Sequence, residues 1–163
     1  MNDVLNPVKI GLALVLLSLA FGVALGISFG VNEDAFQSHI SAGIEANPAV
    51  HDQKSADKIW RYAQRAHFHA TGIAAFSLGL VLLIAFTGMK TSAKKLAAIL
   101  VGLSGFYPLG WFTMYMLSPT LGRHAAHEHI LTELFTYIGV GGLVLGFLMI
   151  VANVFLGVFS KTR

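Results

Sequence analysis

Four long stretches of the chain are almost free of charged residues and are separated by shorter polar segments. They run from about 10 to 31, 67 to 89, 96 to 117 and 130 to 159. A helix needs about 20 apolar residues to cross the hydrocarbon core of a bilayer, and each stretch reaches that length. The pattern predicts an all-α protein, a single domain over residues 1–163 whose four transmembrane helices form an antiparallel bundle. The first stretch is too long for the apolar core of a signal peptide, so we expect it to be retained.

The composition supports a position in the lipid bilayer. Of the 163 residues 55% are hydrophobic and only 12% are charged, whereas about 25% of a soluble domain is charged. This excludes an ordinary soluble enzyme and a disordered chain. The chain has no Cys, which excludes disulfides, iron–sulfur clusters and cysteine nucleophiles. The net charge is +3, but the basic residues are scattered between apolar stretches, so we expect no binding of nucleic acid.

The distribution of Lys and Arg predicts the orientation of the helices. Six of the eleven basic residues lie near the termini and in the short turn between the second and third stretches: Lys9, Lys90, Lys94, Lys95, Lys161 and Arg163. The positive-inside rule therefore places both termini in the cytoplasm, and we expect a bacterial inner membrane with the two larger loops in the periplasm. The first of these loops ends in residues 55–65, whose Trp60 and Tyr62 indicate a short interfacial helix.

All seven histidines fall on the outer side of this topology, and five of them form two clusters at the outer ends of the second and fourth helices: His67, His69, His124, His127 and His129. Residues two apart on a helix point about 200° apart, so one histidine of each pair faces a common site. We expect His69 and His129 to face inward, with His67 and His127 as their substitutes. Glu133 follows His129 on the same helical face, and an intramembrane carboxylate indicates function.

Two neutral imidazoles from facing helices are suited to hold a haem iron inside a bundle. Arg65 and Arg123 lie where haem propionates would emerge, and Arg pairs well with carboxylates. On these features the chain resembles the small four-helix membrane b-type cytochromes. The resemblance implies one haem b near the periplasmic face, bound by His69 and His129, and a protein that passes electrons from a quinol to a periplasmic carrier.

Two other interpretations stay open. The first is a direct copper, zinc or iron site, in which His129 and Glu133 share an ion and His67, His69, His124 or His127 add further ligands. The second is an accessory subunit of a larger membrane complex without a cofactor of its own. No residue of the sequence is identified as catalytic, so whether the protein is an enzyme is left open.

The topology can be tested by labelling, because the chain has no Cys of its own. A thiol introduced by Lys94→Cys lies in the turn predicted to face the cytoplasm, so a membrane-impermeant maleimide added to intact cells is expected not to react with it. Labelling from outside, before the membrane is permeabilised, would overturn the orientation.

Overall fold

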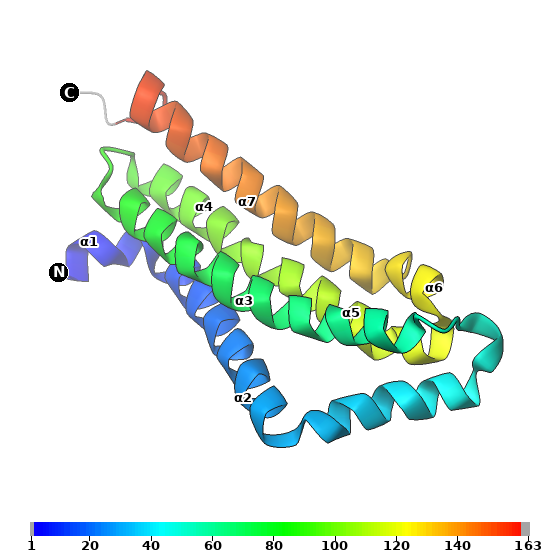
Figure 1. Cartoon of the computed structure of the whole chain (residues 1–163). Coiled ribbons are helices and arrows are strands. Elements are labelled where there is room, and N and C mark those ends of the chain that lie inside the picture. Colours follow the sequence, from blue (N-terminus) through cyan, green and yellow to red (C-terminus); the bar gives the residue numbers. More distant parts are fainter. Residues whose placement is uncertain (1, 161–163) are drawn as a thin grey trace.

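The computed structural model describes residues 2–160, and its regular elements are helices (Figure 1). Within this range the extended backbone is limited to one isolated bridge between Met89 and Ser160. Four helical stretches are long and apolar enough to cross a membrane: Asp3–Ala46, Ser55–Phe86, Thr91–Leu121 and Ile130–Leu156. The predicted all-helical architecture with four long apolar helices is confirmed.

The first long helix is longer than its apolar stretch. After the short turns α1 (Asn2–Leu5) and η1 (Asn6–Val8), α2 runs over Lys9–Ala46 and is interrupted at Asn32, where φ is −149° and ψ is 54°. This break lies next to the predicted end of the first span at residue 31. The chain beyond it, residues 33–46, forms a second helical segment that the hydropathy pattern did not predict. In Figure 1 this segment turns away from the first half of α2 and leads back to α3.

The second long helix, α3 (Ser55–Phe86), follows the turn η2 (Pro48–Val50). Residues 55–65 are helical as expected, but they form the beginning of α3 without a break and are not a separate helix. The short outer segment that is set apart by a break is instead residues 33–46 of α2.

The third span is divided into α4 (Thr91–Gly102), the turn η3 (Leu103–Gly105) and α5 (Phe106–Leu121). The irregular turn ends shortly before Pro108. Proline has no N–H group that could donate a hydrogen bond to the Ser104 carbonyl oxygen four residues earlier, and its ring crowds that carbonyl. A proline inside an apolar stretch predicts a kink, and the structure has the interruption directly before Phe106. A short helix, α6 (Arg123–His127), leads to α7 (Ile130–Leu156), which ends at Gly157 in a left-handed conformation (φ 66°).

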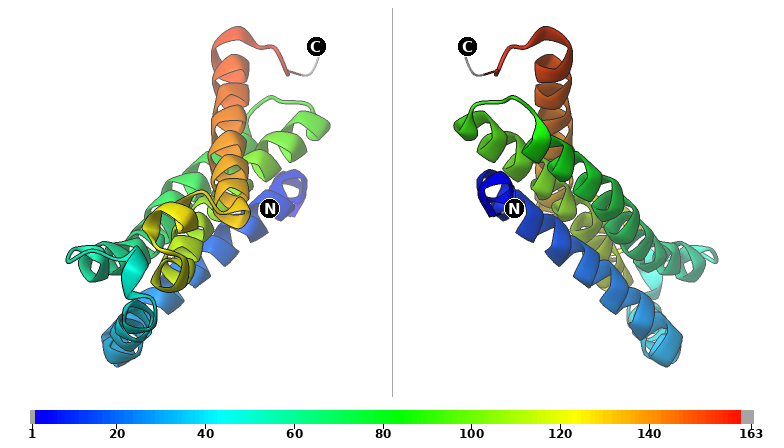
Figure 2. Two further views of the ribbon diagram at one scale, coloured as in Figure 1. Left: turned by 90° about the vertical axis from the view of Figure 1, so that its right-hand side faces the viewer. Right: turned by 90° about the vertical axis from the view of Figure 1, so that its left-hand side faces the viewer.

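The helices form layers, with α7 and α2 on opposite sides of α3, α4 and α5 (Figures 1 and 2). They approach one another closely at glycines. A Cβ atom at Gly22 of α2 would lie 2.9 Å from the Ala70 side chain of α3, and one at Gly146 of α7 would lie 2.8 Å from Val101 of α4. Lipid tails are as apolar as the side chains, so such backbone approach is the main source of helix association in a membrane.

The outer segment of α2 and the following turn are fastened to the end of α5. His51 Nε2 lies 3.0 Å from the carbonyl oxygen of Pro119, and Arg123 donates a hydrogen bond of 2.8 Å to Asp52. Earlier in the same outer segment, Ile40 is buried in a cluster with Ile59 of α3 and Tyr115 of α5. The loop between the first two spans is therefore part of the packed structure.

The glycine contacts predict the effect of adding one methyl group. A Cβ at Gly139 of α7 would meet the backbone of Tyr107 on α5, so Gly139→Ala forces the two helices apart and is expected to lower the free energy of unfolding by about 1–3 kcal/mol. Gly141, on the same helix, has no such neighbour within 4 Å. Gly141→Ala is the matched control and should leave the free energy of unfolding unchanged. Thermal unfolding in detergent micelles measures both, and equal stability of the two variants would contradict the packing described.

Candidate cofactor site

The two histidines of α3 face different neighbours. His67 faces α2, with its ring Nδ1 atom 2.8 Å from the carbonyl oxygen of Gly22. His69 faces α5, where its ring centroid lies 5.0 Å from that of Tyr107 and 5.9 Å from that of Trp111. Both are half-buried. The helical periodicity correctly predicts that they do not share one site, but both faces of α3 are covered by protein.

The hydrogen bond to Gly22 determines the chemical state of the His67 ring. A carbonyl oxygen only accepts, so Nδ1 carries the proton and Nε2 of the neutral imidazole keeps its lone pair. No residue within 2–160 is bonded to Nε2. A ring fixed through one nitrogen to a backbone carbonyl, with the other nitrogen available, has the arrangement usual for a histidine that ligates a metal.

His67 lines a cavity of about 380 Å³ between α2 and α3. This size falls within the range of about 300–1,000 Å³ that is usual for ligand and cofactor pockets. The lining is mostly apolar and comes from both sides of the Asn32 break: Gly26, Phe29, Gly30, Glu33, Trp60, Gln64, His67 and Phe68. A Cβ at Gly26 would lie 2.6 Å from the His67 ring, whereas one at Gly30 would meet nothing within 4 Å. Glycine at these positions leaves room for the ring and for the space next to it.

His69 is held in an aromatic group on the other face of α3. Its ring stacks on Trp111 at an interplanar angle of 21°, and the guanidinium of Arg65 lies 4.7 Å from the Trp111 ring centroid. This is a cation–π distance. Arg65, which the sequence predicts to pair with a haem propionate, contacts this tryptophan in the structure.

The second histidine cluster is spread around the short helix α6. His124 and His127 are exposed, and His124 Nε2 lies 3.5 Å from Glu128. His129 is the N-cap of α7, where its Nδ1 accepts a hydrogen bond of 3.3 Å from the Leu131 N–H. The structure therefore gives His129 a role in starting a helix, which its place in the sequence did not reveal.

Arg123, the second arginine predicted to pair with a propionate, forms the ion pair with Asp52. The pKa of the Asp52 carboxyl group is lowered below its usual value. The largest cause is the hydrogen bond that the Ser55 hydroxyl donates to it, and the positive charge of Arg123 adds to the effect. Asp52 is exposed, so the ion pair is screened by water and contributes little to stability. Its main effect is to orient the Arg123 side chain toward the loop.

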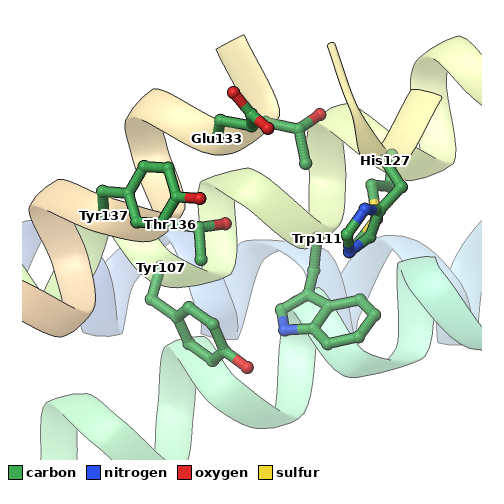
Figure 3. A pocket seen from close by; sticks show the side chains of 8 residues that line it. Tyr107, Trp111, His127, Glu133, Thr136 and Tyr137 are labelled. Atoms are coloured by element: carbon green, nitrogen blue, oxygen red, sulfur yellow. The ribbon is translucent and has the colours of Figure 1, made fainter. Parts of the chain in front are cut away.

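A second cavity, of about 180 Å³, lies between α5 and α7 (Figure 3). Glu133, Thr136 and Tyr137 line it from α7, and Figure 3 shows His127 on the opposite rim. Tyr107 and Trp111 of α5 also line it and contact His69, and Met114 and Thr132 complete the lining. The half-buried Glu133 thus lies in a cavity with His127, not in a hydrogen bond with a histidine ring.

The predicted ligands do not converge on one point. Within residues 2–160, no three side chains of the types His, Asp and Glu are placed to hold a metal ion together. His67 and His69 lie on two faces of α3, His129 caps α7, and Glu133 lines the smaller cavity. The cavity beside His67 was not predicted. Its signal in the sequence is the spacing of Gly22, Gly26 and Gly30, a pattern of small residues that is also typical of helix packing alone.

Searches of protein-family models, of curated proteins and of solved structures returned no match to this chain. The proposals that follow therefore depend on its own residues and their geometry.

Proposed function

We propose that the protein is a membrane electron-transfer protein that binds a b-type haem in the cavity between α2 and α3, with His67 as an axial ligand. The observation that carries the proposal is the hydrogen bond of 2.8 Å between His67 Nδ1 and the Gly22 carbonyl oxygen. In the neutral ring this bond puts the proton on Nδ1 and the lone pair on Nε2, which has no protein partner among residues 2–160 and belongs to a side chain that lines a cavity of suitable size, as an iron ligand requires.

The lining of the cavity fits a flat apolar macrocycle. Phe29 and Trp60 pack edge to face at 5.1 Å, and Phe68 lies beside His67, so aromatic surface surrounds the ligand. Gly26 leaves room for the His67 ring, and Gly30, with nothing within 4 Å of an added Cβ, allows a wide ring to approach α2. A bound haem supplies an iron that gains and loses one electron. The chain holds the imidazole in one tautomer and keeps the site apolar.

The proposal names one protein ligand. The residues that line the cavity include no second histidine and no methionine. His67 would therefore be the single histidine of this lining to hold the iron, in contrast to the pair of His69 and His129 that the sequence favoured. Gln64 and Glu33 are the other polar groups on the lining.

The partners are part of the same proposal. The histidine-bearing half of the bundle is the half that the Lys and Arg distribution places toward the periplasm. With both termini in the cytoplasm of a bacterial cell, the cavity lies within reach of a carrier on the outer side, while the bilayer supplies a quinol as electron donor.

The ligand can be identified by haem reconstitution. We expect the purified protein to bind haem with a Soret band, and we expect His67→Ala to lose that band because Nε2 is removed. His69→Ala and His129→Ala are matched controls that should keep it. Free imidazole added to His67→Gly is expected to restore the spectrum, which separates a lost ligand from a misfolded protein.

Further spectra distinguish the alternatives. A five-coordinate reduced haem is high-spin and binds carbon monoxide, whereas ligation by two histidines gives a low-spin spectrum that carbon monoxide does not change. Loss of haem in His69→Ala or His129→Ala, with retention in His67→Ala, would show that the pair favoured by the sequence is correct. A colourless protein that contains copper, zinc or iron would favour the direct metal site, and a protein without either would favour the accessory subunit.

The glycine beside the ligand predicts a second effect. Gly26→Ala adds a Cβ that would lie 2.6 Å from the His67 ring, so the ring must move and its bond to Gly22 is weakened. We expect haem to dissociate roughly tenfold faster, since about 1.4 kcal/mol of lost binding free energy has that effect. Gly72→Ala on α3 is the control, because nothing lies within 4 Å of a Cβ there. Haem transfer to apomyoglobin measures the rate, and equal rates for both variants would argue against a site at His67.

A further inference from the structure

The cavity between α5 and α7 has a charge pattern that the proposed haem site does not use. Its lining contains one carboxylate, Glu133, and three aromatic rings, those of Tyr107, Trp111 and Tyr137. Among residues 2–160 no lysine or arginine lines it, and His127, which also lines it, is exposed and forms no ion pair with Glu133. Figure 3 shows the Glu133 carboxylate at one edge of this space, with Tyr137 on the same helix.

In the described part of the chain most polar groups of this cavity have no hydrogen-bond partner; the exception is Thr132, whose hydroxyl donates a bond of 2.8 Å to the Ala126 carbonyl oxygen. The side chains of Glu133, Tyr107 and Tyr137 make no hydrogen bond or ion pair there. The Trp111 Nε1 atom is fully buried and is also without a partner among residues 2–160. A carboxylate within a membrane-spanning helix is costly unless something pairs with it. The arrangement is thus electrostatically incomplete.

A cation of small size would supply a partner for the Glu133 carboxylate. A cavity of about 180 Å³ is smaller than the pockets of about 300–1,000 Å³ that hold drug-sized ligands, so it accommodates a head group and not a large ring system. A bare metal ion would need several oxygen or nitrogen ligands, and no group of three is present among residues 2–160. Aromatic rings beside a carboxylate suit an organic ammonium group, which gains from both the charge and the rings.

We propose that the cavity between α5 and α7 binds an organic ammonium group, with Glu133 as its counter-ion and with Trp111 and Tyr137 as aromatic contacts. Trp111 already attracts one cation, since the Arg65 guanidinium lies 4.7 Å from its ring centroid. Tyr137 is 70% exposed and stands at the rim, so the cavity is open toward the surroundings of α7. The ammonium group comes either from the head group of a choline or ethanolamine lipid or from a free amine.

The first test compares choline with 3,3-dimethylbutan-1-ol, which has the same shape but no charge. Binding to the purified holoprotein in neutral maltoside micelles is measured by titration calorimetry. We expect choline to bind and the alcohol not to bind. Glu133→Gln keeps the size of the side chain but removes the charge, so it should weaken choline binding about tenfold or more. Glu128→Gln, in the exposed pair with His124, is the matched control and should bind as the unaltered protein does.

The second test distinguishes the two sources of the ammonium group. Dihexanoyl phosphatidylcholine and dihexanoyl phosphatidylglycerol have the same acyl chains and differ in the head group. Tighter binding of the choline lipid than of free choline identifies a lipid head group, and weaker or equal binding identifies a free amine. Binding of the glycerol lipid equal to that of the choline lipid, equal binding of the uncharged alcohol, or unchanged choline binding by Glu133→Gln would each overturn the proposal.

The proposed ammonium site and the proposed haem site can be tested independently of each other. Glu133→Gln is expected to keep the Soret spectrum of the unaltered protein, because Glu133 does not line the cavity beside His67. His67→Ala is expected to keep its affinity for choline. A variant that loses both properties is misfolded, which the unfolding temperature shows directly.

Discussion

The close approach of helix backbones is the constraint on which the rest of this structure depends. In lipid the burial of apolar side chains gives helices little reason to associate, so contact area between backbones must supply the attraction. Gly139 and Gly146 bring α7 against α5 and α4, and Gly22 brings α2 against Ala70 of α3. These contacts fix where each helix face points. The positions of His67, His69 and Glu133 follow from them.

Much of the fold could be predicted because hydropathy and helix length are local properties. The four apolar stretches and the kink before Pro108 needed no knowledge of neighbouring helices. The helix over residues 33–46 was missed because its apolar positions, Phe36, Ile40 and Ile44, are too few to stand out in a polar segment. They are stabilised by packing against Trp60 and Tyr115, which are distant in sequence. No local pattern reports such contacts.

The candidate site was predictable only in part. Helical periodicity showed that His67 and His69 diverge, but it did not show which neighbour each would meet. The sequence favours His69 because Gly72, one turn further along the helix, has no side chain to fill the space there, yet Gly72 is exposed and has nothing within 4 Å of an added Cβ. The space beside His67 is made by Gly26 on another helix. Likewise, the role of His129 as an N-cap depends on where the turn after α6 ends, which hydropathy does not define.

The imidazole of His67 also sets the separation of two helices. At Gly22 the backbones of α2 and α3 are close, but at Gly26 the ring lies between them, and at Gly30 there is no contact within 4 Å of an added Cβ. The side chain thus works as a spacer that begins the divergence of α2 seen in Figure 1. The width of the gap between α2 and α3 at Gly26 is therefore set by the size of the side chain at position 67.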